Sequence, residues 1–577
     1  MKSNLPPAHQ LYLKKIQDKR MRGSLEETYA MELWQDIPAT LGQAAEHLTK
    51  KRIEYSSELE QLEILKKKIK QNLKRIGILT DSTEENIDRM HLGVVETGQQ
   101  PNCLGGPSLV LNKANFAKKL SELARICPLF NVVDYDGIKP ELTKTRLPGL
   151  SPRGVQISYP TTSEKYNCPI YTLDNPSEKW LQTTLEKIRK SYSAIMKGIE
   201  NKEKYLHNLE HIFTIIKSSY YSTRNVSDFS TKIMGTLINI ESCKGIPIYC
   251  YSMSDTNQLF QTGYETLLSE PNRSRFIETS NQAAEKIIEA GFIPQIGQRT
   301  KDYVPFYIEC AKCRNRIELK YERRNESSNA IIQGKCPKCG ETHVSSYNAS
   351  SPDLTEIIDR ISPRVDSRQL IVNSVVPVLA RVGGPAETAY FAELIPAAKV
   401  LGMNFPFILR YSRVFYNTPW NERLGKSIED KGYPSLMNKL LFNALKQWIK
   451  SRNVKDEKGL ESAHKRIQYS ISTSYRDLNK TCENLKVDIA SRKAMLKDAN
   501  QRSELVNEIQ ETQKTLQEVE LYLSWAYGRY NPDKFGQEVN WNWIDLALVT
   551  GVKDVLGVYE RLYSENTPNS SVFFINL

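Results

Sequence analysis

Long apolar runs are missing from this sequence of 577 residues, and their absence excludes several classes of protein. No stretch approaches the roughly 18 uncharged apolar residues that a transmembrane helix needs. The opening run, Met1-Lys-Ser-Asn-Leu-Pro-Pro7, lacks the apolar core of a secretory signal, so we expect a cytoplasmic protein without a membrane partner. Glycine and proline, at 28 and 27 residues, are too few for a collagen-like or low-complexity chain.

Charge is abundant in both signs, with a modest excess of one. The 79 lysines and arginines exceed the 67 aspartates and glutamates, which gives a formal charge of +12. A basic surface can attract nucleic acid, ATP or other anions, but spread-out charge also belongs to ordinary solvated helix faces. The charge therefore leaves both interpretations open.

Cysteine is scarce, at ten residues, which argues against a disulfide scaffold. Four of the ten form two Cys-x-x-Cys pairs, Cys310 with Cys313 and Cys336 with Cys339. Two such turns can place four thiolates around one ion, and a closed four-sulfur tetrahedron is typical of structural zinc. We therefore predict a zinc ribbon over 305–348. The alternatives are two unrelated thiol pairs or a redox dithiol.

The order of apolar runs predicts an α/β protein. A strand over 93–96, a glycine-rich turn over 97–107, a helix over roughly 108–125 and a buried strand over 128–133 form a βαβ unit. That unit is typical of a nucleotide-binding sheet, so we expect a Rossmann-like parallel-sheet core. The predicted parts are an N-terminal helical segment (1–90), the first half of the core (91–175), a helical and α/β connecting region (176–304), the zinc ribbon insertion (305–348), the second half of the core (349–455), and a C-terminal coiled coil with its tail (456–577).

The last third of the sequence has heptad-like spacing. One apolar seam consists of Leu478, Cys482, Leu485, Ile489 and Leu496, and another consists of Leu505, Ile509, Thr512, Leu516, Val519 and Leu523. The polar stretch 497–502 between them suits a turn. This pattern predicts an antiparallel coiled-coil hairpin, which could join two chains as a homodimer or pack on its own chain.

Two Gly-Gly-Pro turns could carry chemistry. The first, Gly105-Gly-Pro107, precedes a helix that carries Lys113, so its backbone could approach a phosphate near free N–H groups and a cation. The second, Gly383-Gly-Pro385, enters a helix on which Glu387 and Tyr390 share a face and could bind an amine and a hydroxyl. Each turn could also be a plain strand-to-helix connection.

A third candidate is Asp134-Tyr-Asp-Gly137, which follows the buried strand. Asp134 and Asp136 would lie at the carboxyl end of a sheet strand, where carboxylates can bind an amino group or a metal. Asp-Gly dipeptides are also ordinary turn formers, so a purely structural role is the alternative.

Together these residues resemble the cysteine-adding enzymes of bacillithiol biosynthesis, the BshC family. The matching runs are Thr97-Gly-Gln-Gln-Pro101, Gly105-Gly-Pro107 with Lys113, and Gly383-Gly-Pro385 with Glu387, Ala389 and Tyr390. Their order and surroundings match as well, and the likeness spans most of the chain.

The resemblance implies a Rossmann-like core related to class I aminoacyl-tRNA synthetases, with a connecting domain and a helical dimerising arm. It implies a ligase that joins cysteine to the amino group of glucosaminyl-malate as an amide. Since a free carboxylate needs activation before it forms an amide, ATP is the implied cosubstrate. Carried over to this sequence, one wall of the site would hold Thr97, Gly98, Gln99, Gln100, Gly105, Gly106 and Lys113, and the other Gly383, Gly384, Glu387 and Tyr390. No catalytic residue is assigned.

The sequence departs from the family pattern in three places. Asn102-Cys-Leu104 stands where the family has Gly-Leu-Phe, and Asp134-Tyr-Asp-Gly137 lacks the family's histidine. The four-cysteine ribbon is not general among the bacterial enzymes. The last two features resemble those of class I lysyl-tRNA synthetases, although the His-x-Gly-His signature of class I synthetases is missing from this sequence. A divergent, archaeal-type member of the family fits these features best.

Two other functions are open at this point. A synthetase-derived RNA-binding or RNA-modifying protein would use the positive charge, the ribbon and the helical arm, and would bind RNA in a salt-sensitive way. A non-catalytic dimeric scaffold would keep the glycine turns for packing alone. We favour the ligase, acting on cysteine or a similar amino acid and a small amine.

Overall fold

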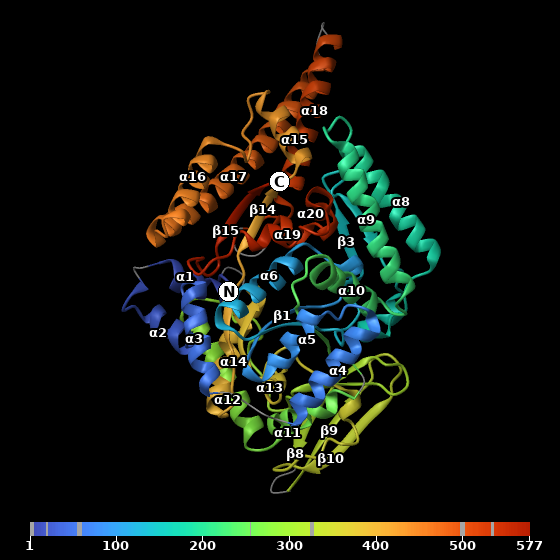
Figure 1. Cartoon of the computed structure of the whole chain (residues 1–577), viewed down its shortest axis with the longest axis vertical. Coiled ribbons are helices and arrows are strands. Elements are labelled where there is room, and N and C mark those ends of the chain that lie inside the picture. The colour runs from blue at the N-terminus through green and yellow to red at the C-terminus, as the bar shows by residue number, and fades with distance from the viewer. Residues whose placement is uncertain are drawn as a thin grey trace.

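A five-stranded parallel sheet forms the centre of the computed structural model, which describes residues 5–18, 21–54, 60–253, 255–323, 328–496, 502–531 and 536–577 (Figure 1). Its strands are β1 (Val94–Gln99), β2 (Cys127–Val132), β5 (Ile248–Cys250), β12 (Val378–Gly383) and β13 (Phe407–Arg410). They lie side by side in the order β13-β12-β1-β2-β5, and every neighbouring pair is parallel. If the five strands are numbered 1 to 5 in chain order and the sheet is read from β5 to β13, the order is 3-2-1-4-5. This is the strand order of a doubly wound nucleotide-binding sheet, so the predicted Rossmann-like fold is confirmed.

Helices connect the central strands. Helix α6 (Leu109–Ala124) follows β1, and α14 (Pro385–Val400) follows β12. The sheet is buried, since β2 and β12 have no exposed position. The first predicted strand was too short: β1 continues to Gln99, which pairs with Val132. Gly98 therefore lies in the strand rather than in a turn, and a Cβ there would come within 2.5 Å of the Asn131 carbonyl oxygen.

The N-terminal part is helical, as predicted. Its helices are α1 (His9–Gln17), α2 (Leu25–Trp34), α3 (Leu41–Glu54), α4 (Glu60–Ile76) and α5 (Asp81–Asp88). Helix α4 buries Leu62, Leu65 and Ile69, spaced three and four residues apart, because that spacing puts them on one face.

Two long excursions interrupt the sheet. Between β2 and β5 the chain forms α7 (Pro140–Thr143), the hairpin β3 (Lys144–Leu147) and β4 (Val155–Ser158), and the helices α8 (Glu178–Ile195), α9 (Lys202–Tyr221) and α10 (Val226–Gly235). Between β5 and β12 it forms α11 (Gln261–Leu268), α12 (Asn272–Glu289), a strand-rich insertion, β11 (Ile361–Pro363) and α13 (Arg368–Asn373).

The strand-rich insertion contains the two Cys-x-x-Cys pairs. Its strands are β6 (Phe306–Glu309), β7 (Arg316–Glu318), β8 (Lys320–Arg323), β9 (Asn329–Lys335) and β10 (Thr342–Asn348), which form the sheets β11-β6-β7 and β10-β9-β8. The first cysteine pair lies in the turn between β6 and β7, and the second lies between β9 and β10. Two hairpins that each carry a Cys-x-x-Cys turn suit the predicted zinc ribbon, and the segment is called the ribbon below.

The C-terminal part follows β13 with β14 (Arg413–Asn417), α15 (Pro419–Glu429), α16 (Lys439–Asn453), α17 (Glu457–Met495), α18 (Arg502–Tyr527), α19 (Gln537–Asn540), α20 (Trp543–Thr550), α21 (Gly557–Glu560) and β15 (Val572–Asn576). Helices α17 and α18 run antiparallel, since Arg492 pairs with Glu508 and Lys486 with Glu520. In Figure 1 these helices and the ribbon strands β8–β10 lie at opposite ends of the long axis.

The predicted heptad seam of α17 packs on its own chain. Leu478, Cys482 and Leu485 are buried in one cluster with Val519 of α18. Most of the predicted turn, 497–501, lies outside the described residues. Dimer formation through this arm therefore stays a prediction. Among the described helices, none combines the length and the apolar character needed to cross a membrane.

Candidate functional site

The carboxyl ends of β1 and β12 meet at the centre of the sheet. Because the strand order reverses between these two strands, this edge is the switch point where α/β sheets place their ligands. β1 ends in the Thr97–Gln100 run, and β12 ends in Gly383 and Gly384. Two of the motifs predicted from the sequence thus lie at one edge of the sheet.

A buried network of charges joins the two strands. Lys113 Nζ of α6 lies 2.9 Å from Glu387 Oε2 of α14, although the two residues are 274 positions apart. Arg381 of β12 lies 2.9 Å from the other Glu387 oxygen and 2.5 Å from Glu96 Oε1 of β1. Glu96 and Arg381 are almost fully buried, and Glu96 also accepts a hydrogen bond from Gln369 at 2.7 Å. Each buried charge therefore has an opposite charge beside it, which is what burial of ions requires.

The network sets the charge state of its members. Burial alone would raise the pKa of Glu387, but the positive charges of Lys113 and Arg381 outweigh it and hold that pKa well below the ordinary range. Burial lowers the pKa of Lys113, and Glu387 opposes this shift. Glu387 is thus ionised at neutral pH, and the charge of Lys113 depends on it.

Glu387 also organises the second Gly-Gly-Pro turn. Its Oε2 accepts a 2.7 Å hydrogen bond from the backbone N–H of Gly384, which caps the first turn of α14. A Cβ on Gly383 would come within 2.9 Å of the Glu387 Cβ, so this position needs glycine, whereas a Cβ on Gly384 would have no neighbour closer than 3.7 Å. One turn further along α14, the hydroxyl of Tyr390 accepts a 3.3 Å hydrogen bond from Arg368. Burial raises the pKa of Tyr390 to about 12.

The first motif contacts the same network. Lys113 Nζ donates to the Gly98 carbonyl at 3.2 Å and lies 3.4 Å from Gln99 Oε1. The Thr97 hydroxyl donates to the Val382 carbonyl at 3.0 Å and so ties β1 to β12. The structure therefore brings Thr97, Gly98, Gln99 and Lys113 together with Glu387 and the end of β12.

Gly105 and Gly106 have a different environment. Both have positive φ, at 77° and 85°, which favours glycine. A Cβ on Gly105 would come within 2.9 Å of Ile233 and 3.1 Å of Trp543 Nε1, and one on Gly106 within 2.9 Å of Asn102. None of these neighbours belongs to the second Gly-Gly-Pro turn. The first turn thus packs on α10 and α20, and its predicted part in a ligand wall stays a prediction.

The two aspartates after β2 have different surroundings. Asp134 is fully buried and accepts hydrogen bonds from Ser227 Oγ at 2.8 Å, from Ser252 N at 2.9 Å and from Ser252 Oγ. Burial raises the pKa of Asp134 to about 6. Asp136 instead accepts a 3.0 Å hydrogen bond from Gln100 and lies 3.6 Å from Arg316 of the ribbon. Asp134 therefore ties β2 to the end of β5, and Asp136 connects the ribbon to the Thr97–Gln100 run.

A cleft of about 540 Å³ opens beside Gln99 and Gln100. Its basic lining residues are Lys144 and Arg146 of the β3–β4 hairpin and Arg529, which follows α18. Burial and the positive charges of Arg529 and Arg153 lower the pKa of Arg146. An anion bound there would be favoured, because its negative charge would offset the repulsion between these arginines. Sequence reasoning missed these three residues because the β3–β4 hairpin and Arg529 are far apart in the chain and form no motif.

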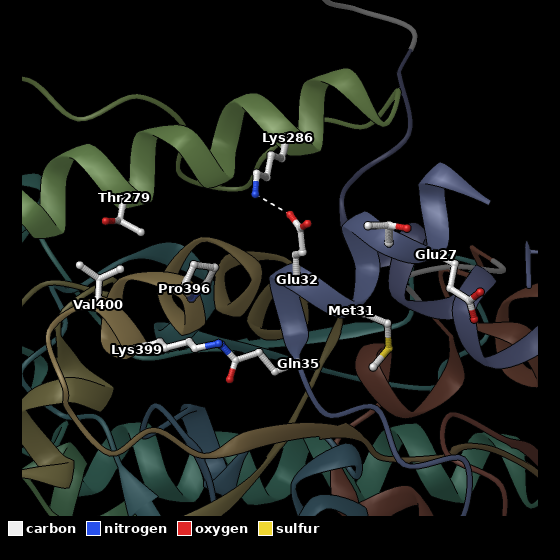
Figure 2. Close-up of a pocket in the computed structure, with 10 residues that line it drawn as sticks. Glu27, Met31, Glu32, Gln35, Thr279, Lys286, Pro396, Lys399 and Val400 are labelled. Carbon is white, nitrogen blue, oxygen red and sulfur yellow. Dashed lines mark hydrogen bonds and ion pairs between the residues drawn. The ribbon is translucent and has the colours of Figure 1, made fainter. Parts of the chain in front are cut away.

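A second groove, of about 650 Å³, lies at the other end of α14 (Figure 2). Pro396, Lys399 and Val400 of α14 line it, and an ion pair of 2.5 Å between Glu32 and Lys286 crosses from α2 to α12. Since the groove lies at the C-terminal end of this helix, it is separate from the capped end beside Gly384.

The four ribbon cysteines converge on one point. Their sulfur atoms all lie within 4.8 Å of one another, and three pairs are 3.5 Å apart. With Zn–S bonds of about 2.3 Å, the edge of a zinc tetrahedron measures about 3.8 Å, so the cluster fits zinc closely. Gly340, at φ 75°, follows the second pair and allows its tight turn. Cys310, Cys313, Cys336 and Cys339 could therefore hold a structural metal with no open position.

Comparison with known proteins is consistent with this geometry. The sequence profile described as "Bacillithiol biosynthesis BshC, N-terminal Rossmann-like domain" matches residues 22–411, about two thirds of the chain. The chain is 24% identical over 429 residues to a protein of Carboxydothermus hydrogenoformans, covering 71% of each chain. It is 25% identical to a protein of Desulforamulus reducens, covering 60% of this chain and 59% of the relative. A Bacillus cereus protein is 22% identical, covering 65% of this chain and 66% of the relative. All three carry the name "Putative cysteine ligase BshC".

Proposed function

This chain belongs to the BshC family of bacillithiol biosynthesis, and we propose that it is an ATP-using ligase that joins the carboxyl group of cysteine to the amine of glucosaminyl-malate or a related small acceptor. The relatives' printed names support cysteine as the amino acid. We further propose a cytoplasmic protein that forms a homodimer through the α17–α18 arm.

The ion pair between Lys113 and Glu387 is the observation that carries this proposal. The two residues belong to different family motifs, yet they meet at 2.9 Å at the switch point of the sheet. A scaffold could preserve each glycine turn for packing. A buried ion pair between the two motifs, however, holds their backbones in register beside a cleft, as a shared ligand site would need.

The cleft beside Gln99 and Gln100 suits an anionic substrate. Lys144, Arg146 and Arg529 contribute three positive charges to its lining, against one carboxylate from Glu141. The ligands this charge favours are the phosphates of ATP or the carboxylates of a malate group. In the proposed reaction, the cysteine carboxylate attacks a phosphorus atom of ATP and becomes an acyl phosphate with release of ADP, or an acyl adenylate with release of pyrophosphate. The acceptor amine then attacks its carbonyl carbon, forms the amide and releases the phosphate-bearing group.

The reaction can be tested directly. The zinc-loaded protein is incubated with ATP, cysteine and glucosaminyl-malate, and mass spectrometry measures the conjugate together with ADP or AMP. We expect one conjugate for each ATP consumed. Lys113→Met should reduce this yield, and Lys118→Met at a partly exposed position of the same helix should not. A folded, zinc-loaded protein that forms no conjugate with any thiol amino acid would exclude the proposed activity.

A further inference from the structure

A second, smaller cavity lies between the sheet and the zinc ribbon. It measures about 290 Å³, near the lower end for small-molecule sites, so it suits a small metabolite. Its lining comes from the ends of β2 and β5 (Tyr135, Tyr251 and Ser252), from the ribbon (Glu309) and from β11 (Ile361 and Ser362). The cavity thus exists only where these three parts of the chain come together.

The charge of this lining is opposite to that of the whole chain. Glu309, Asp255 and Asp359 all line the cavity, and the lining contains no lysine, arginine or histidine among the described residues. The chain has an excess of 12 positive charges, and the 540 Å³ cleft is basic. Two of these carboxylates have a cation beside them, since Arg314 lies 2.9 Å from Glu309 and Lys68 lies 3.5 Å from Asp255. Asp359 therefore supplies the negative charge of this lining that no described cation pairs with.

Tyrosine rings give the cavity a second property. Tyr135, Tyr171 and Tyr251 line it, and the rings of Tyr135 and Tyr251 meet edge to face at 5.2 Å. Aromatic faces beside carboxylates form the environment that attracts a primary ammonium group, by cation–π contact and by ion pairing. Arginines already lie over two of these rings, Arg316 over Tyr135 at 5.5 Å and Arg314 over Tyr171 at 5.2 Å. We propose that this cavity binds the ammonium group of a small substrate, with the ring of Tyr251 beside it and Asp359 supplying the opposite charge.

The ribbon holds one side of this cavity in place. Glu309 directly precedes Cys310, and it accepts hydrogen bonds from Tyr171 and, at 2.9 Å, from Arg314, which directly follows Cys313. Arg316 lies over the Tyr307 ring at 4.4 Å and pairs with Asp136. Since Cys310 and Cys313 lie between Glu309 and Arg314, a zinc ion bound there would fix the turn that positions this carboxylate.

The position of the cavity gives it a place in the reaction. Asp136 follows Tyr135 in the chain and binds Gln100, which lines the basic cleft. The ammonium site and the anion site are thus adjacent, on either side of the contact between Gln100 and Asp136. This part of the inference rests on the proposed function, because the ammonium could belong to cysteine or to the amino sugar.

Calorimetry on the full zinc-loaded chain tests the site with L-cysteine and D-glucosamine as probes, and with N-acetylcysteine and N-acetylglucosamine as controls that lack the ammonium charge. We expect one of the two amines to bind and its acetylated form to bind at least about tenfold more weakly, because one lost charge-assisted contact corresponds to about that factor. The amine that binds identifies the source of the ammonium group. Equal binding of an amine and its acetylated form, or no binding of either amine, would overturn the assignment.

Two pairs of variants locate the site. Glu309→Gln and Asp359→Asn should each lower the affinity of the protein for the amine. Glu318→Gln on the ribbon and Asp353→Asn near β11 should leave that affinity unchanged. Asp359 lies outside the ribbon, so its variant tests the site without altering zinc content, which is measured in every sample. An amine affinity that is unchanged in both cavity variants would reject the site. The conjugate assay separates the two proposals. If the amine binds but no conjugate forms, the ammonium site is supported and the proposed ligase activity is rejected. If the conjugate forms and Asp359→Asn leaves the KM for the amine unchanged, the ligase activity is supported and the ammonium site is rejected.

Discussion

The replacement Glu387→Gln tests the charge network most directly. The substitution keeps the shape of the side chain and removes the charge that Lys113 and Arg381 face at 2.9 Å each. Removing one partner of a buried pair leaves an uncompensated charge, which costs about 3–5 kcal/mol of the free energy of unfolding. A glutamine oxygen can still accept the hydrogen bond from Gly384, so the cap on α14 should persist.

The pH dependence of this effect follows from the pKa shifts. Because the pKa of Glu387 is lowered in the folded protein, its stabilisation is present above the unfolded value near 4.5 and is lost as the pH falls through the folded value. The pKa of Lys113 is lowered from 10.5, so the unfolded chain binds more protons and stability rises with pH toward that value. Without Glu387 the pKa of Lys113 falls further. The difference in stability between Glu387→Gln and the natural protein should therefore shrink between pH 7 and pH 10.

A double-mutant cycle isolates the pair. Urea unfolding at pH 7 of Glu387→Gln, Lys113→Met and the double variant should give a coupling free energy well above 1 kcal/mol, since the side chains are only 16% and 5% exposed. The matched control is the more exposed pair of Lys118 and Glu122 on α6, which lies at 3.5 Å and should couple by about 0.5 kcal/mol or less. Equal coupling for the two pairs, or a cost of Glu387→Gln that is the same at pH 7 and pH 10, would refute the reasoning.

Four further predictions concern the metal, a buried acid, the first glycine turn and the arm. Metal analysis should find one zinc per chain, and a chelator should lower the Tm; a Tm that is unchanged in metal-free protein would contradict a structural role. Burial raises the pKa of Asp545 to about 7. The folded protein therefore loses stability as the pH rises from 4 to 7, because the unfolded chain ionises this carboxyl group first. Asp545→Asn should therefore raise the Tm relative to the natural protein at pH 8 but not at pH 4, whereas the exposed Asp554→Asn should change neither. Gly105→Ala should cost about 1–3 kcal/mol and more than Gly402→Ala, since φ is positive at both but nothing lies within 4 Å of a Cβ at Gly402. Sedimentation should show a dimer that Val487→Glu, on the exposed side of α17, dissociates without a change in Tm; a monomeric natural protein would reject the dimer.

The sequence predicts most of the sheet because its strands are short apolar runs buried on both faces. The periodicity of the helices and the spacing of the cysteines depend likewise on local geometry, so the sequence predicts the four-cysteine cluster and the two long helices α17 and α18. The bound zinc and the coiled-coil dimer stay predictions. The end of β1 is missed because Thr97, Gly98 and Gln99 look like a turn, and only the pairing with β2 makes them a strand. The packing of Gly105 on Trp543 depends on a contact between residues more than 400 positions apart, which no local pattern can reveal.

The same reasoning explains why the site residues split into predicted and missed groups. Parallel strands need long crossover connections, and each connection leaves the sheet at the carboxyl end of a strand. The β3–β4 hairpin and the zinc ribbon lie in the connections that follow β2 and β5, so both begin at the edge where ligands bind. The helices that directly follow β1 and β12 supply residues that family motifs predict, such as Lys113 on α6 and Glu387 on α14. The inserted segments supply Arg146, which lines the basic cleft, and Glu309, which lines the smaller cavity. Under the proposed function, the choice of substrate would therefore depend on the insertions as well as on the shared core.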